Sequence, residues 1–284
     1  MSSLFLRPDL ALAPHEVGEV VTLSGDEARH AVTVNRLRVG EHTALGDGNG
    51  LVVHGVVVRV EGKELDIAVE RSEVHEAPSP RLVLVQALAK GDRDELAIQA
   101  ATELGVAAVV PWQAERSVSR WNEQKAAKGV ERWTTIVREA AKQSIRPFVP
   151  AVGDLVDTGE LAALARECAG AGEGRRMLLL EPSAETRLTE VALEPLGGAS
   201  TGAGHGTATG TATGPAAPGT ATGTTPAEPT VFLVVGPEGG ISPRELEQLG
   251  EAGAVAVRLG DEVLRTSTAG PAALAVLNAA FGRW

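Results

Sequence analysis

Three short segments in the second half of the chain combine glycines, carboxylates and one arginine at the ends of apolar runs. LLLEP includes Glu181, VVGPEGG includes Glu238, and RLGDEVLRTST covers residues 258–268. Ligands of an open α/β sheet bind outside the carboxyl ends of its strands, so we expect the three segments to line one pocket. The glycines at 236, 239 and 240 would let backbone groups approach a ligand directly.

A phosphate is the first ligand to consider, because a glycine loop that leads into a helix N-terminus is an anion site. However, Ile241 and Ser242 follow the last glycine where a P-loop has Lys and Ser or Thr, and the fingerprint G-x-G-x-x-G is absent. The acids of the three segments would repel a phosphate and suit a cation. They are Glu181, Glu238, Asp261 and Glu262. Alternatively, residues 236–240 form only a tight strand-to-helix turn.

Apolar runs alternate with helical patterns from Arg81 to the end of the chain, which predicts a mostly parallel sheet covered on both faces. The runs are RLVLVQALA, VAAVVPW, RRMLLLEP, VFLVVG and AVAVRLG. DRDELAIQAATELG predicts a helix with Asp92 and Glu95 as its capping box and Gly105 as its end. A long helix is expected from about residue 122 to 144, and another over TGELAALAREC.

Two more helices should follow the glycine loop. The first of them is predicted to start at Pro243, with Ser242 as its N-cap and Glu245 at its third position. The loop DEVLRTSTAG should then precede a final apolar helix, PAALAVLNAAF, beginning at Pro271. Residues 197–229 contain almost only Gly, Ala, Thr, Ser and Pro, and we expect them to be a disordered low-complexity insertion.

Residues 1–72 are typical of a small β-rich domain. Ser24 and Glu27 have the spacing of a capping box and predict one short helix. Hairpin turns are expected at 47–50 and 61–63 between strands of alternating pattern, which suits a compact barrel. We therefore expect a first domain over 1–72, a linker over 73–80 and a second domain over 81–284.

Composition limits the kinds of partner and site. The net charge of −11 disfavours a polyanionic partner overall, but eleven Lys and Arg against eight Asp and Glu between residues 81 and 146 leave room for a local basic face. The single cysteine excludes an internal disulfide, and the six histidines lack metal-ligand spacing, so we expect no metal site. No apolar run approaches the roughly 20 residues that span a bilayer, and MSSLFLRPDL lacks a signal peptide's core, so we expect a cytoplasmic protein.

GPEGGIS, followed by LGDEVLRTSTA and a helix of small residues, resembles the paired C-terminal motifs of the SPOUT methyltransferases. Over most of its length the chain resembles the ribosomal RNA small subunit methyltransferase E family. The segments that carry this wider resemblance are LVQALAKGDRDELAIQAATELGVAAVVPWQAERSVSRW, KQSIRPFVPAV and ARHAVTVNRLRVGE. The insertion at 197–229 lies outside it. The combination of motifs is specific, whereas GPEGG alone would be a weak signal.

The resemblance implies an α/β fold with a SPOUT-type trefoil-knotted, mostly parallel sheet, preceded by a PUA-like RNA-binding β-barrel domain. It also implies a homodimer that uses S-adenosylmethionine to methylate N3 of a uridine in 16S rRNA of the small ribosomal subunit. The cofactor-binding residues that it implies are Leu180, Glu181, Gly236, Glu238, Gly239, Gly240, Leu259, Gly260, Leu264, Thr266 and Thr268.

Arg265 is the candidate catalytic residue, because its charge could stabilise negative charge on the uracil carbonyls as the N3 proton leaves. An ion pair with Glu238 or Glu262 is the alternative role. This chain departs from many relatives on both sides of Arg265. They have Gly-Pro-Arg where this chain has Gly260-Asp261-Glu262, and Thr-Glu-Thr where it has Thr266-Ser267-Thr268. Contacts to RNA phosphates are expected from basic side chains of both domains, although each alone could be a solvated surface charge. They are Arg7, Arg29, His30, Arg36, Arg38, Arg116, Arg120 and Arg146.

Two other classes of function stay open at this point. The chain could be an enzyme that binds a nucleotide phosphate at the glycine loop, in which case nucleotide would compete with S-adenosylmethionine. It could also be a catalytically silent RNA-binding or ribosome-assembly protein, for which the departures at Asp261, Glu262 and Ser267 are the sequence hint.

Overall fold

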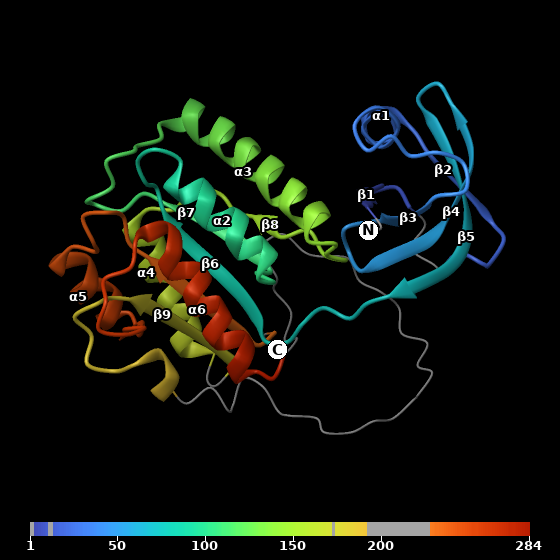
Figure 1. Cartoon of the computed structure of the whole chain (residues 1–284). Coiled ribbons are helices and arrows are strands. Elements are labelled where there is room, and N and C mark those ends of the chain that lie inside the picture. Colours follow the sequence, from blue (N-terminus) through green and yellow to red (C-terminus); the bar gives the residue numbers. More distant parts are fainter. Residues whose placement is uncertain (1–2, 11–13, 172–173, 192–227) are drawn as a thin grey trace. The chain divides into compact units, whose positions relative to one another are not determined.

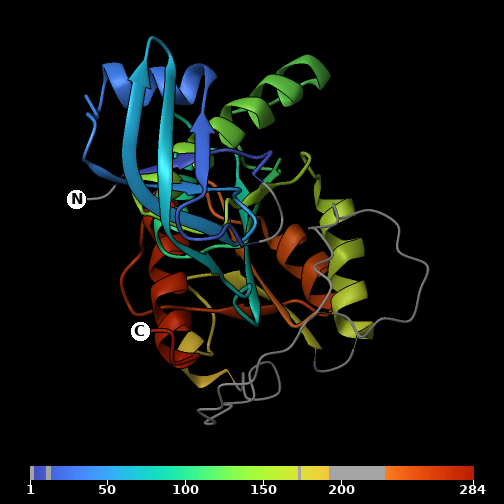
Figure 2. The ribbon, with the colours of Figure 1, turned by 90° about the vertical axis from the view of Figure 1, so that its right-hand side faces the viewer.

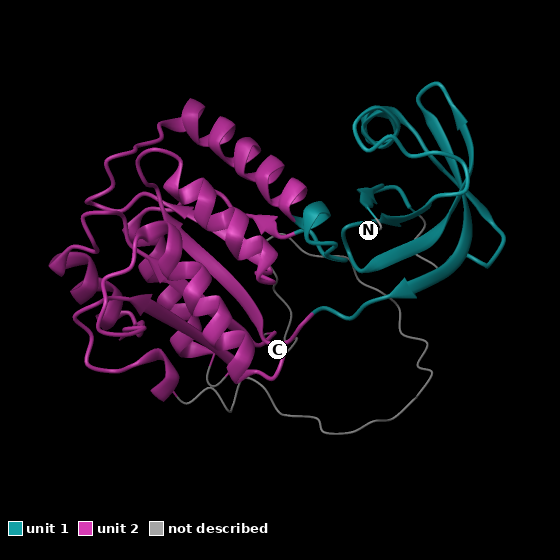
Figure 3. Ribbon diagram, in the orientation of Figure 1, with its two compact units in different colours: residues 1–77, 141–149, 207–217 teal, residues 78–140, 150–206, 218–284 magenta. Residues whose placement is uncertain are grey.

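The computed structural model of the chain describes residues 3–10, 14–171, 174–191 and 228–284 (Figure 1). These residues form two compact units, coloured separately in Figure 3. The first holds the described residues up to Ala77 together with 141–149, and the second holds the others. Of the predicted insertion at 197–229, all but the last two residues lie outside the described residues.

The first unit is a curled five-stranded sheet with strand order β1-β3-β4-β5-β2. Its elements are β1 (Leu4–Leu6), β2 (Val20–Leu23), α1 (Gly25–Thr33), β3 (His42–Gly46), β4 (Leu51–Glu61) and β5 (Glu64–Val74). Both predicted hairpin turns are confirmed, at 47–50 and 61–63. Two register shifts between β4 and β5 bend this long hairpin, whose curvature is visible in Figure 2.

The inner side chains of this sheet form the core of the first unit. Phe5, Leu45, Val53, Leu65 and Ile67 are almost completely buried there. They belong to four different strands, so the curled sheet encloses a single apolar core. This confirms the small β domain expected at the start of the chain.

Helix α1 begins where the sequence predicted, but the predicted capping box is wrong. The side chain of Ser24 makes no capping hydrogen bond. Glu27 instead accepts a hydrogen bond from Nζ of Lys142 at 3.2 Å, and Lys142 belongs to the segment 141–149 of the same unit. A buried ammonium group competes successfully for the carboxylate that the box would have used.

The second unit contains a six-stranded sheet with strand order β11-β9-β10-β6-β7-β8, in which every pairing is parallel. Its strands are β6 (Arg81–Ala87), β7 (Ala108–Trp112), β8 (Ala151–Val152), β9 (Arg175–Leu180), β10 (Thr230–Val235) and β11 (Val255–Val257). Its helices are α2 (Arg93–Glu103), α3 (Glu123–Gln143), α4 (Thr158–Gly170), α5 (Pro243–Glu251), α6 (Thr266–Ala280) and the short 3-10 helix η2 (Leu188–Glu190). Helix α3 continues into the first unit at residue 141.

Helices cover both faces of this parallel sheet, as predicted. Alternate residues such as Val85 and Phe232 form one apolar cluster with Leu161 of α4 and Leu249 of α5. On the other face α6 packs closely against β6, because Gly270 lies over Leu84 with no room for a Cβ atom. Helices α2 and α6 lie side by side on this face (Figure 1). The trefoil knot stays a prediction.

Two predicted helix starts differ from the structure. Asp92 has φ of 58° and does not cap α2 with its side chain, because Asp94 accepts hydrogen bonds from Ala89 N and Glu95 N. The carboxylate of Glu95 bonds Arg132 instead. Helix α6 starts at Thr266, well before the predicted Pro271. A proline inside the second turn removes one backbone donor but does not prevent the turn before it from forming.

Candidate functional site

A cavity of about 570 Å³ lies at the carboxyl ends of β9, β10 and β11. The three segments singled out by the sequence meet there, as predicted. Most of the predicted pocket residues line this cavity. They are Leu180, Glu181, Gly236, Glu238, Gly239, Gly240, Leu259, Gly260, Leu264, Arg265 and Thr266. Thr268, in the first turn of α6 with an exposed side chain, does not line it.

The glycine loop is built for close backbone packing. A Cβ atom on Gly236 would come within 2.8 Å of the Ile241 side chain, so no other residue fits without displacement. Gly240 has φ of 70°, a conformation that side chains disfavour. The predicted cap of α5 is confirmed, because Ser242 Oγ accepts from Glu245 N while Glu245 accepts from Ser242 N. The loop thus turns sharply and presents its backbone to the cavity.

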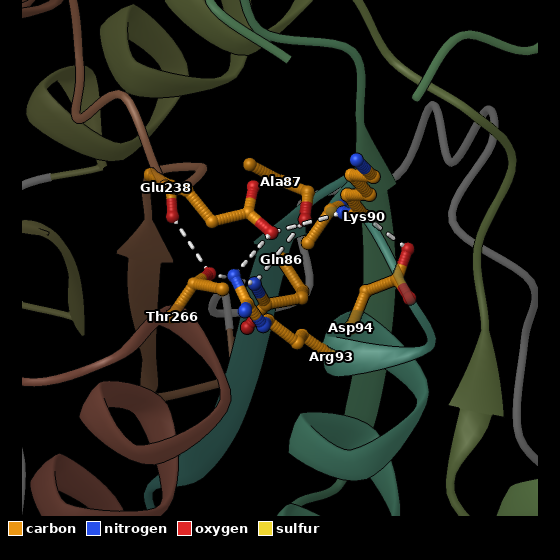
Figure 4. A network of polar contacts seen from close by, with 9 residues as sticks. Gln86, Ala87, Lys90, Arg93, Asp94, Glu238 and Thr266 are labelled. Carbon is orange, nitrogen blue, oxygen red and sulfur yellow. Dashed lines mark hydrogen bonds and ion pairs between the residues drawn. The ribbon is translucent and has the colours of Figure 1, made fainter. Parts of the chain in front are cut away.

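The hydroxyl of Thr266 joins the glycine loop to the first turn of α6. It donates to the carbonyl oxygen of Gly236 at 2.8 Å and accepts from Nε2 of Gln86 at 2.8 Å (Figure 4). Gln86 is completely buried at the end of β6 and also donates to Ala87 O at 3.2 Å. Its Oε1 atom has no hydrogen-bond partner within the described part of the chain. The amide therefore fixes the direction in which the Thr266 hydroxyl donates.

Glu238 connects the glycine loop to the turn between β6 and α2. Its Oε1 atom accepts from the backbone N–H of Lys90 at 3.0 Å and from Nη1 of Arg93 at 3.1 Å (Figure 4). In the same turn, Asp94 accepts from Ala89 N, and burial raises the pKa of the Asp94 carboxyl. Arg93 carries no signal of this contact in the sequence, because nothing in the helix that it begins points to a loop 145 residues further on.

Arg116 reaches the same loop from the segment that follows β7. Its Nη1 atom donates to the carbonyl of Gly239 at 3.0 Å, and a Cβ on Gly239 would lie 3.3 Å from Arg116 Cβ. Arg120 donates to Glu115 O at 2.8 Å, which stiffens this segment. Trp121 packs on Gly129 of α3, where there is no space for a larger residue. Arg116, predicted to contact RNA, therefore lines the cavity.

A buried carboxylate holds three segments together beneath the glycine loop. Glu245 is 3% exposed and accepts from Glu115 N at 2.7 Å and from Thr158 Oγ1 at 2.8 Å, besides its bond to Ser242 N. Ser242 Oγ also donates to Glu115 Oε2 at 2.6 Å. Because the starts of α4 and α5 and the segment carrying Arg116 share this one side chain, their relative positions are fixed.

The cavity is less acidic than the sequence suggested, because four arginines from three segments also line it. They are Arg93, Arg116, Arg258 and Arg265, facing Glu181, Glu238 and Glu262. The fourth predicted acid, Asp261, does not line the cavity and lies 3.6 Å from Arg258 Nη1 and 3.7 Å from Arg187 Nη2. Glu181 accepts from Ser183. A cationic ligand remains suited to these acids, but an anionic group would also find donors.

Arg265 differs from the other three arginines of the cavity. Within the part of the chain that the structure describes, its guanidinium makes no hydrogen bond or ion pair, whereas Arg93 and Arg258 are paired with acids and Arg116 with a carbonyl. The alternative role predicted for it, an ion pair with Glu238 or Glu262, is therefore not formed among these residues. Arg265 is available to a ligand.

The other predicted RNA contacts lie in differing environments. In the first unit, Arg36 and Arg38 are exposed in the segment after α1, whereas Arg7 and Arg29 are paired with nearby acids. The hydrogen bond from Arg7 lowers the pKa of Asp9. His30 is half-buried with its ring edge-on to Phe5. Burial lowers the pKa of Arg146 to about 10, so this arginine is not a simple surface charge.

The His, Cys, Asp and Glu side chains of the described residues form no group of three placed to hold a metal ion. Every helix described is too short or too polar to span a bilayer.

Two sequence families match the chain. The one described as an RNA methyltransferase domain covers residues 75–278, and the one described as an RNA methyltransferase PUA domain covers residues 23–70. The first match contains the parallel sheet and every residue that lines the cavity. The second covers most of the curled sheet of the first unit.

Individual proteins resemble the chain over nearly its whole length. Ribosomal RNA small subunit methyltransferase E of Mycobacterium bovis is 38% identical over 269 residues, which is 95% of this chain and 90% of that protein. The crystal structure of ribosomal RNA small subunit methyltransferase E from Neisseria gonorrhoeae bound to S-adenosyl methionine has a TM-score of 0.74 at 27% identity, covering 99% and 98% of the two chains. A putative methyltransferase from Legionella pneumophila in complex with the bound cofactor SAM has a TM-score of 0.72 at 27% identity, with the same coverage.

Proposed function

Because the chain belongs to the ribosomal RNA small subunit methyltransferase E family, we propose that it methylates N3 of a uridine in 16S rRNA within the small ribosomal subunit. Methylation of ribosomal RNA with S-adenosylmethionine as donor follows from membership of the family. The uracil N3 atom and the assembled subunit are the finer parts of the proposal. The observation that supports it most directly is the cavity formed where three strand ends meet.

The cavity suits S-adenosylmethionine in size and in lining. Its volume of about 570 Å³ is typical of a small-molecule site. A side chain has no room on the packed side of Gly236 and would be tight at Gly239, so the loop can meet a ligand with its backbone. The donor supplies an electrophilic methyl group on a positively charged sulfonium. We assign its binding to the residues of the cavity that the sequence had singled out, which are Leu180, Glu181, Gly236, Glu238, Gly239, Gly240, Leu259, Gly260, Leu264 and Thr266.

The unpaired guanidinium of Arg265 is the group best suited to act on the uracil. N3 of uracil carries a proton that must leave before or during methylation, and negative charge then develops on the neighbouring carbonyls. A cation placed beside these carbonyls stabilises such charge. Arg265 stands at the N-cap of α6, where Thr266 holds the backbone against Gly236. Alignment of the reacting groups by the rigid loops contributes the rest of the acceleration.

Replacement of Arg265 tests this role. The variant Arg265→Ala should lower the rate of methyl transfer by about a hundredfold or more, with little change in the dissociation constant of the donor. Arg265→Lys should restore part of the rate, because it keeps the charge but not the planar donor pair. Full methylation by Arg265→Ala with unchanged donor affinity would remove Arg265 from the mechanism.

Capture of the RNA falls to the first unit and to exposed arginines of the second. The match to an RNA methyltransferase PUA domain supports this assignment, with Arg36 and Arg38 among its exposed basic side chains. Arg7, Arg29, His30, Arg116, Arg120 and Arg146 complete the proposed contacts. A homodimer in the cytoplasm is the assembly and location that we propose for this activity.

The decisive experiment transfers labelled methyl from S-adenosylmethionine to small ribosomal subunits from a strain lacking this protein. Mass spectrometry should identify uridine methylated at N3. Transfer to another base would support S-adenosylmethionine as the donor but would contradict uracil N3 as the methylated atom. Binding of donor and subunits without transfer would favour a silent RNA-binding protein. Competition by a nucleotide for the donor site would favour the enzyme that uses the glycine loop for phosphate.

A further inference from the structure

Three charged side chains that line the cavity, Glu238, Arg93 and Arg265, differ in whether they are paired. The carboxylate of Glu238 is 25% exposed and directs a single oxygen atom to both Lys90 N and Arg93 Nη1. Arg93 is 44% exposed, so this ion pair lies at the edge of the cavity where water reaches it. The guanidinium of Arg265, in contrast, has no hydrogen-bond or ion-pair partner among the described residues. The cavity therefore contains a carboxylate that is already paired, that of Glu238, and a guanidinium that is unpaired, that of Arg265.

The backbone brings these two groups to the same wall. The hydrogen bond from Thr266 Oγ1 to Gly236 O joins the residue after Arg265 to the start of the loop that carries Glu238. Both side chains line the cavity. Opposite charges that line one cavity attract one another. A Glu238 carboxylate released from Arg93 has Arg265 as an unpaired cation in the same cavity.

We infer that Arg93 is a positioning residue whose ion pair holds Glu238 against the β6–α2 turn and so keeps Arg265 free for the substrate. This inference rests on the proposed function, because it assumes that Arg265 acts on the RNA base. Glu238 would then line the donor site while its carboxylate stays bound to Arg93 and does not pair with Arg265. The backbone N–H of Lys90 supports it by binding the same oxygen.

A double-mutant cycle separates this role from a structural one. In the wild-type background, Arg93→Ala should lower the rate of methyl transfer by roughly tenfold, with the donor dissociation constant nearly unchanged. In the Glu238→Gln background the same replacement should have almost no effect, because a neutral amide can still accept from Lys90 N but cannot neutralise Arg265. Arg93→Lys should restore most of the rate, because it keeps a cation beside Glu238.

Arg244→Ala is the matched control. Arg244 is exposed in the first turn of α5 and does not line the cavity, so its loss changes the net charge of the protein equally. Its transfer rate should equal that of the wild type. An equal effect of Arg93→Ala in both backgrounds, or a weaker donor affinity in place of a slower transfer, would overturn the inference.

A structural measurement adds a readout besides activity. The crystal structure of the Arg93→Ala protein should show a carboxylate oxygen of Glu238 within about 4 Å of the Arg265 guanidinium, the usual limit of an ion pair. If Glu238 stays on Lys90 and Arg265 stays unpaired, the inference is wrong whatever the rate. If the new ion pair forms and the rate is unchanged, Arg93 has no positioning role.

Failure of the proposed function gives a different pattern. A wild-type protein that transfers no methyl group to small subunits would contradict the uracil substrate and the role assigned to Arg265. The inference about Arg93 would then be wrong as well, even if Glu238 and Arg265 formed an ion pair, because it depends on the role of Arg265. An active wild type in which Arg93→Ala shows neither the ion pair nor the slower transfer would overturn the inference alone.

Discussion

The hydroxyl of Thr266 donates to the carbonyl of Gly236 across 2.8 Å, although the two residues lie 30 positions apart in the chain. This bond ties the first turn of the last helix to the glycine loop, and the completely buried Gln86 orients it. Two walls of the cavity therefore depend on one hydroxyl group.

Thr266→Val removes that hydroxyl while keeping the shape of the side chain. A buried carbonyl and a buried amide would then lose a partner, so we expect a loss of about 1–3 kcal/mol of unfolding free energy. The donor dissociation constant should rise by roughly tenfold, because the two walls are no longer joined. Urea unfolding and calorimetric titration measure these effects. Thr266→Ser should behave as the wild type, and Thr134→Val on the exposed face of α3 is the control. Unchanged donor affinity in Thr266→Val would contradict the structural role of the bond.

Gly236→Ala should abolish donor binding without unfolding the protein. The added methyl group would lie 2.8 Å from the Ile241 side chain, and the loop must move to accommodate it. Equilibrium binding of S-adenosylmethionine and circular dichroism test the two parts of this statement. Gly250→Ala is the contrasting variant, because it lies in α5 with open space around it and should gain about 0.5–1 kcal/mol of stability. Normal donor affinity in Gly236→Ala would show that the loop is not part of the site.

Glu245→Ala should be among the most destabilising single replacements in the second unit. It leaves Ser242 N, Glu115 N and the hydroxyl of Thr158 without their acceptor, at a cost of about 3 kcal/mol or more. Chemical denaturation measures the loss. Glu247→Ala, exposed on the same helix, should change stability by less than about 0.5 kcal/mol. A similar small change for both variants would mean that Glu245 does not anchor the three segments.

The lone thiol of the chain predicts a dependence on pH. Burial raises the pKa of Cys168 from 9.0 to about 11. A thiol with a higher pKa in the folded protein contributes stability that is present below pH 9 and is lost as the pH rises toward 11. The unfolding free energy should therefore fall over this interval by on the order of 2 kcal/mol more than in Cys168→Ala. Denaturation series in reducing buffer give the comparison. Parallel curves for the two proteins would refute the shift.

The double replacement of Arg36 and Arg38 by Glu should abolish methylation of small subunits while donor binding stays normal. Both side chains are exposed in the segment after α1, and phosphate contacts dominate the affinity of such a surface. In RNA-binding titrations, the slope of log affinity against log salt should become shallower by about two. Lys63→Glu, at the exposed β4–β5 turn, is the control. Loss of donor binding in the double variant would mean that these arginines support the fold.

The sequence predicted what is encoded locally. Ser242, Pro243 and Glu245 specify the start of α5 within four residues, and the structure has that cap. The same reasoning was wrong for Asp92 and Glu95, because Asp94 and Arg132 compete for the same groups and neither competitor follows from the capping pattern. Pro271 also misled the prediction for α6, because a proline in the second turn of a helix resembles one at its start.

The charge pattern of the cavity could not be predicted from the three segments alone. Arg93 and Arg116 reach it from turns after β6 and β7, and their contacts depend on the strand order of the sheet. The carboxylates of the loops could be identified from the sequence, but the arginines that lie near them could not. The sequence therefore located the site, while its electrostatic balance required the fold.

The position of β10 has a consequence for how the protein is made. This strand pairs along all six of its residues with β9 on one side and β6 on the other, yet it is translated after both. A nascent chain that has not reached Val235 carries two unmatched strand edges, which are sites of aggregation. The donor site cannot form in such a chain. A truncated product that ends before β10 lacks the glycine loop and the residues at the start of α6 that line the cavity, so it is inactive.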